Sequence, residues 1–87
     1  MGLETVEIVL WAEQTFAVDM PDEEVGKIQT VGEFAKYIAA KVNADKGTTI
    51  NYQDTLVQII DMLVADYDIK RESINTRSRF IADLGLN

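Results

Sequence analysis

Apolar residues recur at helical spacing near the start of the chain, and the spacing predicts a helix from Leu3 to Phe16. One set of its apolar residues repeats every fourth position and defines one face: Ile8, Ala12 and Phe16. A second set lies off that face: Val6, Leu10 and Trp11. A helix that is apolar on more than one side is either central in a bundle or leaves part of its surface for a partner.

Two further stretches predict long helices. Thr30 and Glu33 have the spacing of a capping box, which predicts a helix start at Thr30. The apolar residues that follow at spacings of three and four are Val31, Phe34, Ala35, Ile38 and Val42. The most regular helix is predicted over Asp54 to Tyr67, where the apolar stripe comprises Leu56, Ile59, Ile60, Leu63, Val64 and Tyr67.

The segments between these helices differ in character. Pro21, followed by three acidic residues and weakened by Gly26, predicts a helix of only one or two turns. Residues 43–53 are polar and without apolar rhythm, which predicts a linker with a span of roughly 18 Å. Residues 68–87 predict a long, packed loop anchored by Ile69, Ile74, Phe80, Ile81, Leu84 and Leu86.

The predicted fold is therefore an all-α domain with three longer helices, one short helix and one long ordered loop. A chain of 87 residues is enough for one such domain. There is no Cys and no His, which removes thiolate chemistry, the usual neutral base and the commonest transition-metal ligand. No enzyme is expected.

Fifteen acidic residues against eight basic ones give a net charge of −7, which repels nucleic acid and attracts basic protein surfaces. The acidic start has no basic region of the kind that opens a signal peptide, and no apolar run approaches membrane length. A soluble cytoplasmic protein is expected, without membrane or nucleic-acid partners.

Three apparent sites of carboxylate chemistry are weak. Asp66 and Asp68 begin like a calcium loop, but Lys70 stands where the next oxygen ligand belongs. The acidic residues after Pro21 are better explained as a solvated helix N-terminus than as a cation site. Glu4 and Glu7 have no apolar surroundings to raise a pKa, so catalytic roles are not expected. No metal is predicted.

A stronger signal appears when the end of the chain is read into its beginning. FIADLGLN followed by GLETVEIVLW resembles the acyl carrier proteins, whose signature is Asp-Leu-Gly, one variable residue, then Asp-Ser-Leu. Asp83, Leu84 and Gly85 match the first part, and Leu3 resumes the second. Further family-like segments are Thr5-Val6-Glu7, Pro21-Asp22-Glu23-Glu24, Lys27-Ile28, Thr30-Val31 and Tyr37-Ile38.

The resemblance implies the helical bundle of that family in circularly permuted order. Residues 1–42 correspond to the family's second to fourth helices, and residues 54–87 to its first helix and first loop. Residues 43–53 would join the family's original termini. Circular permutation is tolerated where the original termini lie close together.

The resemblance also implies a function, the carriage of acyl intermediates in fatty-acid or polyketide-type synthesis on a 4'-phosphopantetheine arm. The attachment Ser falls at Gly2, which has no hydroxyl, so no arm is expected on this chain. The positions that the resemblance assigns to the cofactor region are Gly2, Leu3, Asp83, Leu84, Gly85 and Asn87. Ser73 and Ser78 lie outside the signature and are poor substitutes.

Synthase enzymes and a phosphopantetheinyl transferase are the partners that the resemblance implies, bound through an acidic surface. Its predicted residues are Glu4, Glu7, Glu13, Asp22, Glu23 and Glu24. The core around Ile8, Ala12, Phe16, Phe34, Ile38, Ile60 and Leu63 is implied to shelter an acyl chain, or else is simply packed. Two alternatives stay open: a non-modified acidic interaction module, and a dimer in which two chains exchange halves.

Overall fold

The computed structural model describes residues 2–87, and it confirms the all-α fold with three long helices and one short helix. The helices are α1 (Leu3–Phe16), α2 (Asp22–Val25), α3 (Val31–Lys46) and α4 (Tyr52–Tyr67), followed by the 3-10 turn η1 (Arg71–Ser73). Within these residues there is no strand, only an isolated bridge between Thr30 and Arg79.

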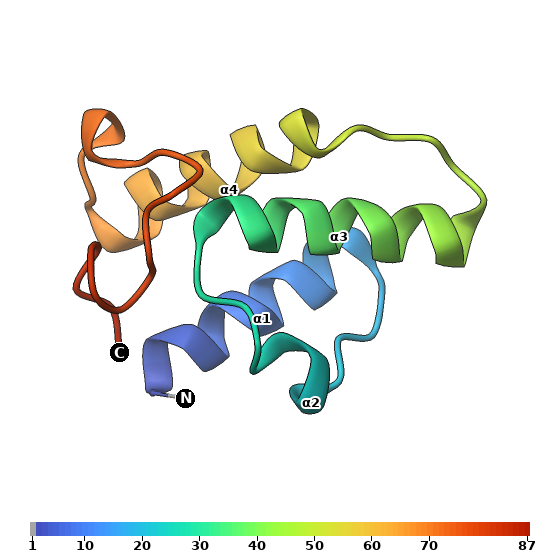
Figure 1. Cartoon of the computed structure of the whole chain (residues 1–87), viewed down its shortest axis with the longest axis horizontal. Coiled ribbons are helices and arrows are strands. Elements are labelled where there is room, and N and C mark those ends of the chain that lie inside the picture. Colours follow the sequence, from blue (N-terminus) through green and yellow to red (C-terminus); the bar gives the residue numbers. More distant parts are fainter. Residues whose placement is uncertain (1) are drawn as a thin grey trace.

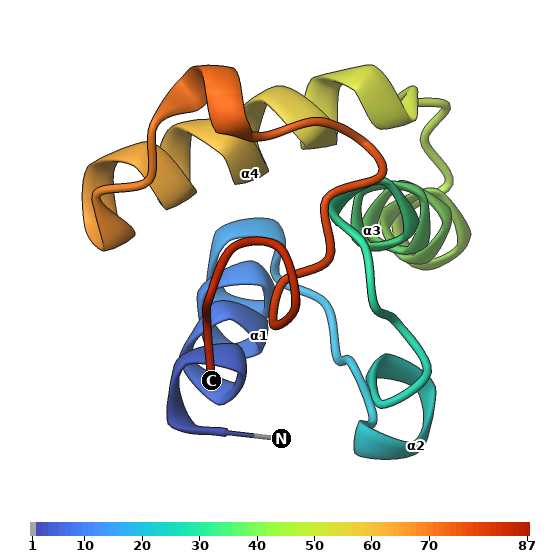
Figure 2. The same ribbon diagram turned by 60° about the vertical axis from the view of Figure 1, so that its left-hand side comes forward.

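Helices α3 and α4 run in opposite directions and make the most extensive contact between helices (Figure 1). Helix α1 packs below them, and the segment after α4 returns to the start of α1 (Figure 2). The centre of the core is formed by side chains with no exposed surface, among them Val31, Ile38, Ile59 and Leu63. No helix of the described residues is long and apolar enough to cross a membrane.

The predicted linker is shorter than its composition indicated. Helix α3 continues to Lys46 and ends at Gly47, which has φ 67°, and the Asn51 side chain caps the start of α4. Residues 43–46 and 52–53 are therefore helical, and only residues 47–51 connect the two helices. The apolar rhythm stops at Val42 because the last turn of α3 lies in solvent, whereas a glycine cap decides where the helix ends.

The connection between α3 and α4 is ordered by one side chain. Asn43 donates from Nδ2 to the Ile50 carbonyl at 2.9 Å, and its Oδ1 accepts from the Ile50 amide at 2.9 Å. The Thr48 hydroxyl donates to the same Oδ1 at 2.8 Å. The connection is therefore an ordered turn, because the Asn43 amide group holds it to the helix that precedes it.

The long segment after α4 is packed against the core, as predicted. Ile74, Phe80 and Leu86 are buried, and two further predicted anchors, Ile69 and Leu84, pack partly buried against them. Ile81 was wrongly predicted as an anchor, because 61% of its surface is exposed. Residues 80–84 form consecutive turns, in which Phe80 is buried and its neighbour Ile81 is exposed.

This segment also supplies hydrogen-bond acceptors to the start of α3. The Val31 amide donates to the Ser78 carbonyl and the Gly32 amide to the Thr76 carbonyl, each at 2.9 Å. The predicted capping box is confirmed, with Thr30 and Glu33 satisfying each other's backbone amides. Three of the amides that a helix N-terminus leaves unpaired thus have partners outside the α3 backbone ladder.

Gly32 allows this close approach. A Cβ at position 32 would lie 2.7 Å from the Thr76 carbonyl oxygen and 2.9 Å from its Cβ. We therefore expect Gly32→Ala to lower the free energy of unfolding by about 1–3 kcal/mol, because backbone atoms must move apart to admit the methyl group. Urea denaturation measures the change. Gly26→Ala is the control, since Gly26 has a helical φ of −62° and a Cβ there would come no closer than 3.1 Å to the Asp22 carbonyl oxygen, so a smaller loss than in Gly32→Ala is expected. Equal losses in both variants would contradict the steric explanation.

Candidate functional site

The two ends of the described chain lie in contact. The Thr5 amide donates to the backbone oxygen of Asn87 at 2.7 Å, and the Asn87 amide donates to the Glu4 carboxylate at 3.0 Å. A Cβ placed on Gly2 would lie 2.3 Å from the backbone carbon of Asn87. Gly2 and Asn87, which stand at opposite ends of the sequence, are thus immediate neighbours in space.

The start of α1 depends on this contact because it has no side-chain cap of its own. Gly2 occupies the N-cap position, and glycine has no side chain whose oxygen could accept from the second or third amide of the helix. The Asn87 oxygen takes that role for the Thr5 amide, the third of the helix. The Gly2 carbonyl meanwhile accepts from the Thr5 hydroxyl at 2.8 Å and from the Val6 amide at 3.2 Å.

The residues just before Asn87 form a closed turn. The Asp83 carboxylate accepts from the Arg79 amide at 2.8 Å and from Arg79 Nε at 3.3 Å, and these bonds lower the pKa of Asp83 below its usual value. Gly85 adopts the left-handed conformation, with φ 71°. Leu86, 5% exposed, then anchors the turn in the core. Of the residues predicted for the cofactor region, Asp83 thus bonds within its own loop.

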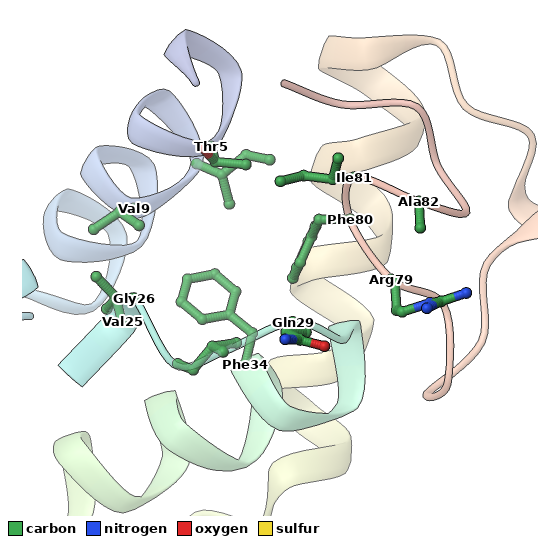
Figure 3. A pocket seen from close by; sticks show the side chains of 12 residues that line it. Thr5, Val9, Val25, Gly26, Gln29, Phe34, Arg79, Phe80, Ile81 and Ala82 are labelled. Atoms are coloured by element: carbon green, nitrogen blue, oxygen red, sulfur yellow. The ribbon is translucent and has the colours of Figure 1, made fainter. Parts of the chain in front are cut away.

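Beside this junction lies an apolar groove of about 420 Å³ between α1, α2 and residues 79–82 (Figure 3). Its buried lining comes from three helices and the loop: Ile8, Val25, Phe34 and Phe80. Thr5 also lines it, so the groove begins one helical turn from Gly2. Of the core residues implied to shelter an acyl chain, Ile8 and Phe34 line the groove, whereas Ile38 and Leu63 belong to the fully packed interior.

The acidic residues predicted as a partner surface lie along α1 and α2. Four of them accept hydrogen bonds within the chain: Glu4 from the Asn87 amide, Glu7 from the Tyr67 hydroxyl, Glu13 from the Met20 amide and Glu24 from the Tyr37 hydroxyl. Asp22 and Glu23 are exposed in the first turn of α2, and within residues 2–87 neither takes part in an ion pair.

Glu24 has the strongest intramolecular contacts of this set. Tyr37 donates to its Oε1 at 2.6 Å and Lys41 Nζ lies 3.0 Å from the same oxygen. The Tyr37 hydrogen bond, followed by that from Lys41, lowers the pKa of Glu24. Burial and the Glu24 contact in turn raise the pKa of Tyr37. Sequence reasoning missed this cluster, since Tyr37 and Lys41 share a face of α3 but nothing in their spacing indicates α2 as the neighbour.

An exposed apolar stripe runs along α1 next to the acidic residues. Its members are Leu3, Val6 and Leu10, with exposed fractions of 74%, 40% and 50%. Spacings of three and four place them on one side of the helix. Trp11 is instead half-buried and meets Phe16 edge to face, with ring centroids 5.9 Å apart. Part of the second apolar side of α1 is thus left in solvent.

Nothing in the described residues resembles a metal centre. No group of three or more potential metal-ligating side chains comes together there. The site combines an apolar groove, a junction of two backbone segments and an acidic, partly apolar helix face.

Comparison with known proteins finds curated proteins that resemble part of the chain. The chain is 46% identical over 44 residues to a protein named acyl carrier protein from Picosynechococcus sp. (strain ATCC 27264 / PCC 7002 / PR-6). The matched part is 51% of this chain and 54% of that protein, so the chain spans about half the length of the curated relative that it matches. No family model and no solved structure matches the chain. The match supports the family resemblance that the motifs indicated.

The junction can be tested by adding a methyl group to it. We expect Gly2→Ala to displace Asn87 and to lower the stability of the start of α1 by about 1 kcal/mol, the net worth of one hydrogen bond. Hydrogen exchange at the Thr5 amide should then be about fivefold faster. Deletion of Asn87 should have the same effect, and the two changes combined should add little to either. Fully additive effects would show that Gly2 and Asn87 do not interact.

The Tyr67 hydroxyl, which donates to Glu7 at 3.2 Å, predicts a pH dependence. Burial, with the neighbouring Glu7, raises the pKa of Tyr67 from 10.0 to about 12. Its contribution to stability is therefore complete below pH 10 and lost as the pH rises towards 12. Urea midpoints at pH 8 and pH 11.5 should differ less in Tyr67→Phe than in the unaltered chain. Tyr52→Phe, which leaves the Tyr67–Glu7 contact in place, should keep the original difference, and an unchanged profile in Tyr67→Phe would contradict the assignment.

Proposed function

We propose that this chain is an acyl-carrier-like helical domain in circularly permuted order, which presents an acidic helix to synthase-type enzymes and can hold an acyl chain in its groove. The observation that carries the proposal is the contact between Asn87 and the Gly2–Thr5 segment. In that arrangement Asp83-Leu84-Gly85 and Leu3 stand in the order of the family signature, interrupted at position 2.

The half-length match gives independent support. A colinear alignment of a permuted chain can follow only one of its two exchanged segments at a time. A match that covers 51% of this chain and 54% of the relative is consistent with such an exchange. The ordered five-residue connection between α3 and α4 is likewise in keeping with a link that joins two neighbouring helix ends.

The residues at the junction do not fit covalent attachment of 4'-phosphopantetheine. Attachment requires a hydroxyl at position 2, and Gly2 has none. A side chain there would also collide with Asn87. The nearest hydroxyl in the junction, that of Thr5, donates to the Gly2 carbonyl at 2.8 Å and serves the helix start. We therefore infer that this chain binds acyl groups, if they are delivered, without an arm of its own.

Docking to partners follows from the same face of α1. The exposed apolar stripe provides area to bury, and the adjoining acidic residues attract basic surfaces over a Debye length of about 8 Å in physiological salt. The stripe also favours the alternative function, a non-modified interaction module, because docking requires no arm. The two functions make different predictions for a chain whose segments are returned to the order of the family. The carrier proposal predicts that such a chain can receive 4'-phosphopantetheine, whereas the interaction-module alternative does not require it.

The decisive experiment reverses the proposed permutation. A chain made of residues 49–87, one Ser and residues 3–48 restores the signature, except that Asn87 stands at its second Asp, and places the new ends in the α3–α4 connection. With coenzyme A and a phosphopantetheinyl transferase, mass spectrometry should show a gain of one 4'-phosphopantetheine group. The same reordered chain with Ala in place of Ser, and the present chain, should show no gain.

Each contrary result has a distinct meaning. A gain of mass by the present chain would place the attachment site elsewhere than position 2. A folded Ser-containing reordered chain that gains nothing would refute the permutation. Co-elution of the present chain with the transferase, without modification, is the result that the interaction-module alternative requires, and light scattering at two concentrations distinguishes a monomer from a dimer with exchanged halves.

A further inference from the structure

The floor of the groove is formed by two phenylalanines from distant parts of the chain. Phe34, on the first turn of α3, and Phe80, in the loop after η1, meet edge to face with ring centroids 5.8 Å apart and an interplanar angle of 83°. Both are buried, at 3% and 7% exposure. In Figure 3 the Phe34 ring stands between Val25 of α2 and the ring of Phe80.

Below this pair the interior is closed. Ile38 lies one turn beyond Phe34 on the same face of α3, since residues four apart on a helix are neighbours, and it has no exposed surface. The Phe34 ring therefore separates the groove from the centre of the bundle. Removing the ring would leave a cavity that deepens the groove, because packed interiors close only partly around a deleted side chain.

The rim of the groove indicates the charge of its occupant. Among the described residues that line it, Arg79 is the only one with a cationic side chain, and its Nε already lies 3.3 Å from the Asp83 carboxylate. The chain as a whole carries a net charge of −7. An alkyl chain with an uncharged head, such as a thioester or an ester, is therefore favoured over a fatty-acid anion.

We propose that the Phe34–Phe80 pair sets the length of the alkyl chain that the groove accepts, so that short, unbranched acyl groups are sheltered completely and longer ones are not. The inference rests on the proposed function, since it names the class of acyl group held at the same site. Each methylene that the groove buries should strengthen binding by about fourfold. Binding should stop improving at the length at which the chain reaches the two rings.

The experiment measures affinity along a series of neutral probes, the N-acetylcysteamine thioesters of straight-chain acids with four to twelve carbons. Titrations followed by NMR of the Val9 and Val25 methyl groups give the affinity for each length. In Phe34→Ala the fourfold increase per methylene should continue for at least two more carbons than in the unaltered chain. An apolar cavity in a protein interior stays dry and binds apolar ligands, which is why the longer chain should enter it.

Two further variants control for loss of packing. Phe34→Leu keeps more of the side-chain volume and should shift the length limit in the same direction by a smaller amount. This variant replaces Phe34→Ala in the test if Phe34→Ala does not fold. Phe16→Leu also removes an aromatic edge contact, that with Trp11, but lies outside the groove lining. It should leave the length limit unchanged.

The outcomes are separable from those of the proposed function. An identical length limit in all folded variants, with short thioesters bound, would overturn the role of the Phe34–Phe80 pair and leave the carrier proposal intact. Failure of every thioester to bind would overturn the inference as well as acyl sheltering. The permuted order would still be decided separately, by the mass of the reordered chain.

Discussion

Backbone oxygens of residues 76–87 complete the N-termini of two helices, and the arrangement of the bundle depends on this. The Asn87 oxygen accepts from the third amide of α1, and the Thr76 and Ser78 carbonyls accept from the first two amides of α3. Helix N-termini leave four amides without intrahelical partners, and burying them unpaired is costly. A single irregular segment thus ties α1 to α3 and fixes the distance between them.

The same segment builds the groove. To reach α3 and then α1, it passes Gln29, where the Phe80 amide donates to the Gln29 carbonyl at 3.0 Å. That contact holds the Phe80 ring against Phe34 and leaves Ile81 at the open side of the groove. A binding site and a structural cap therefore share one stretch of backbone, and a change that displaces Asn87 acts on a segment that also lines the groove.

The acidic character of the chain has two roles in this structure. Glu4, Glu13 and Glu24 accept hydrogen bonds that hold the chain end, the turn after α1 and the short helix α2. Asp22 and Glu23 remain exposed at the start of α2, where the helix dipole favours them. Docking by charge therefore draws on residues of which several also accept hydrogen bonds within the fold.

The sequence by itself determined the local structure. Residues 3–16 are helical with the predicted bounds, the Thr30–Glu33 capping box starts α3, and a helix of one turn follows Pro21, because spacing and capping act within one or two turns. The predicted bounds of the α3–α4 connection were wrong, because the last turn of α3 lies in solvent and its residues show no apolar periodicity. The family motif predicted that Asp83–Asn87 belongs beside Leu3, but only as a resemblance.

Only the tertiary structure decided which residues that are distant in the sequence become neighbours. It brought Asn87 to the Thr5 amide, Tyr37 to Glu24 and Phe80 to Phe34, and it left Leu3 and Ile81 exposed although both are apolar. These pairs are separated by 13 to 82 residues, and nothing in local spacing specifies them. They follow from the return of the chain across the bundle, whose course is selected by the joint burial of apolar side chains and the pairing of helix-end amides.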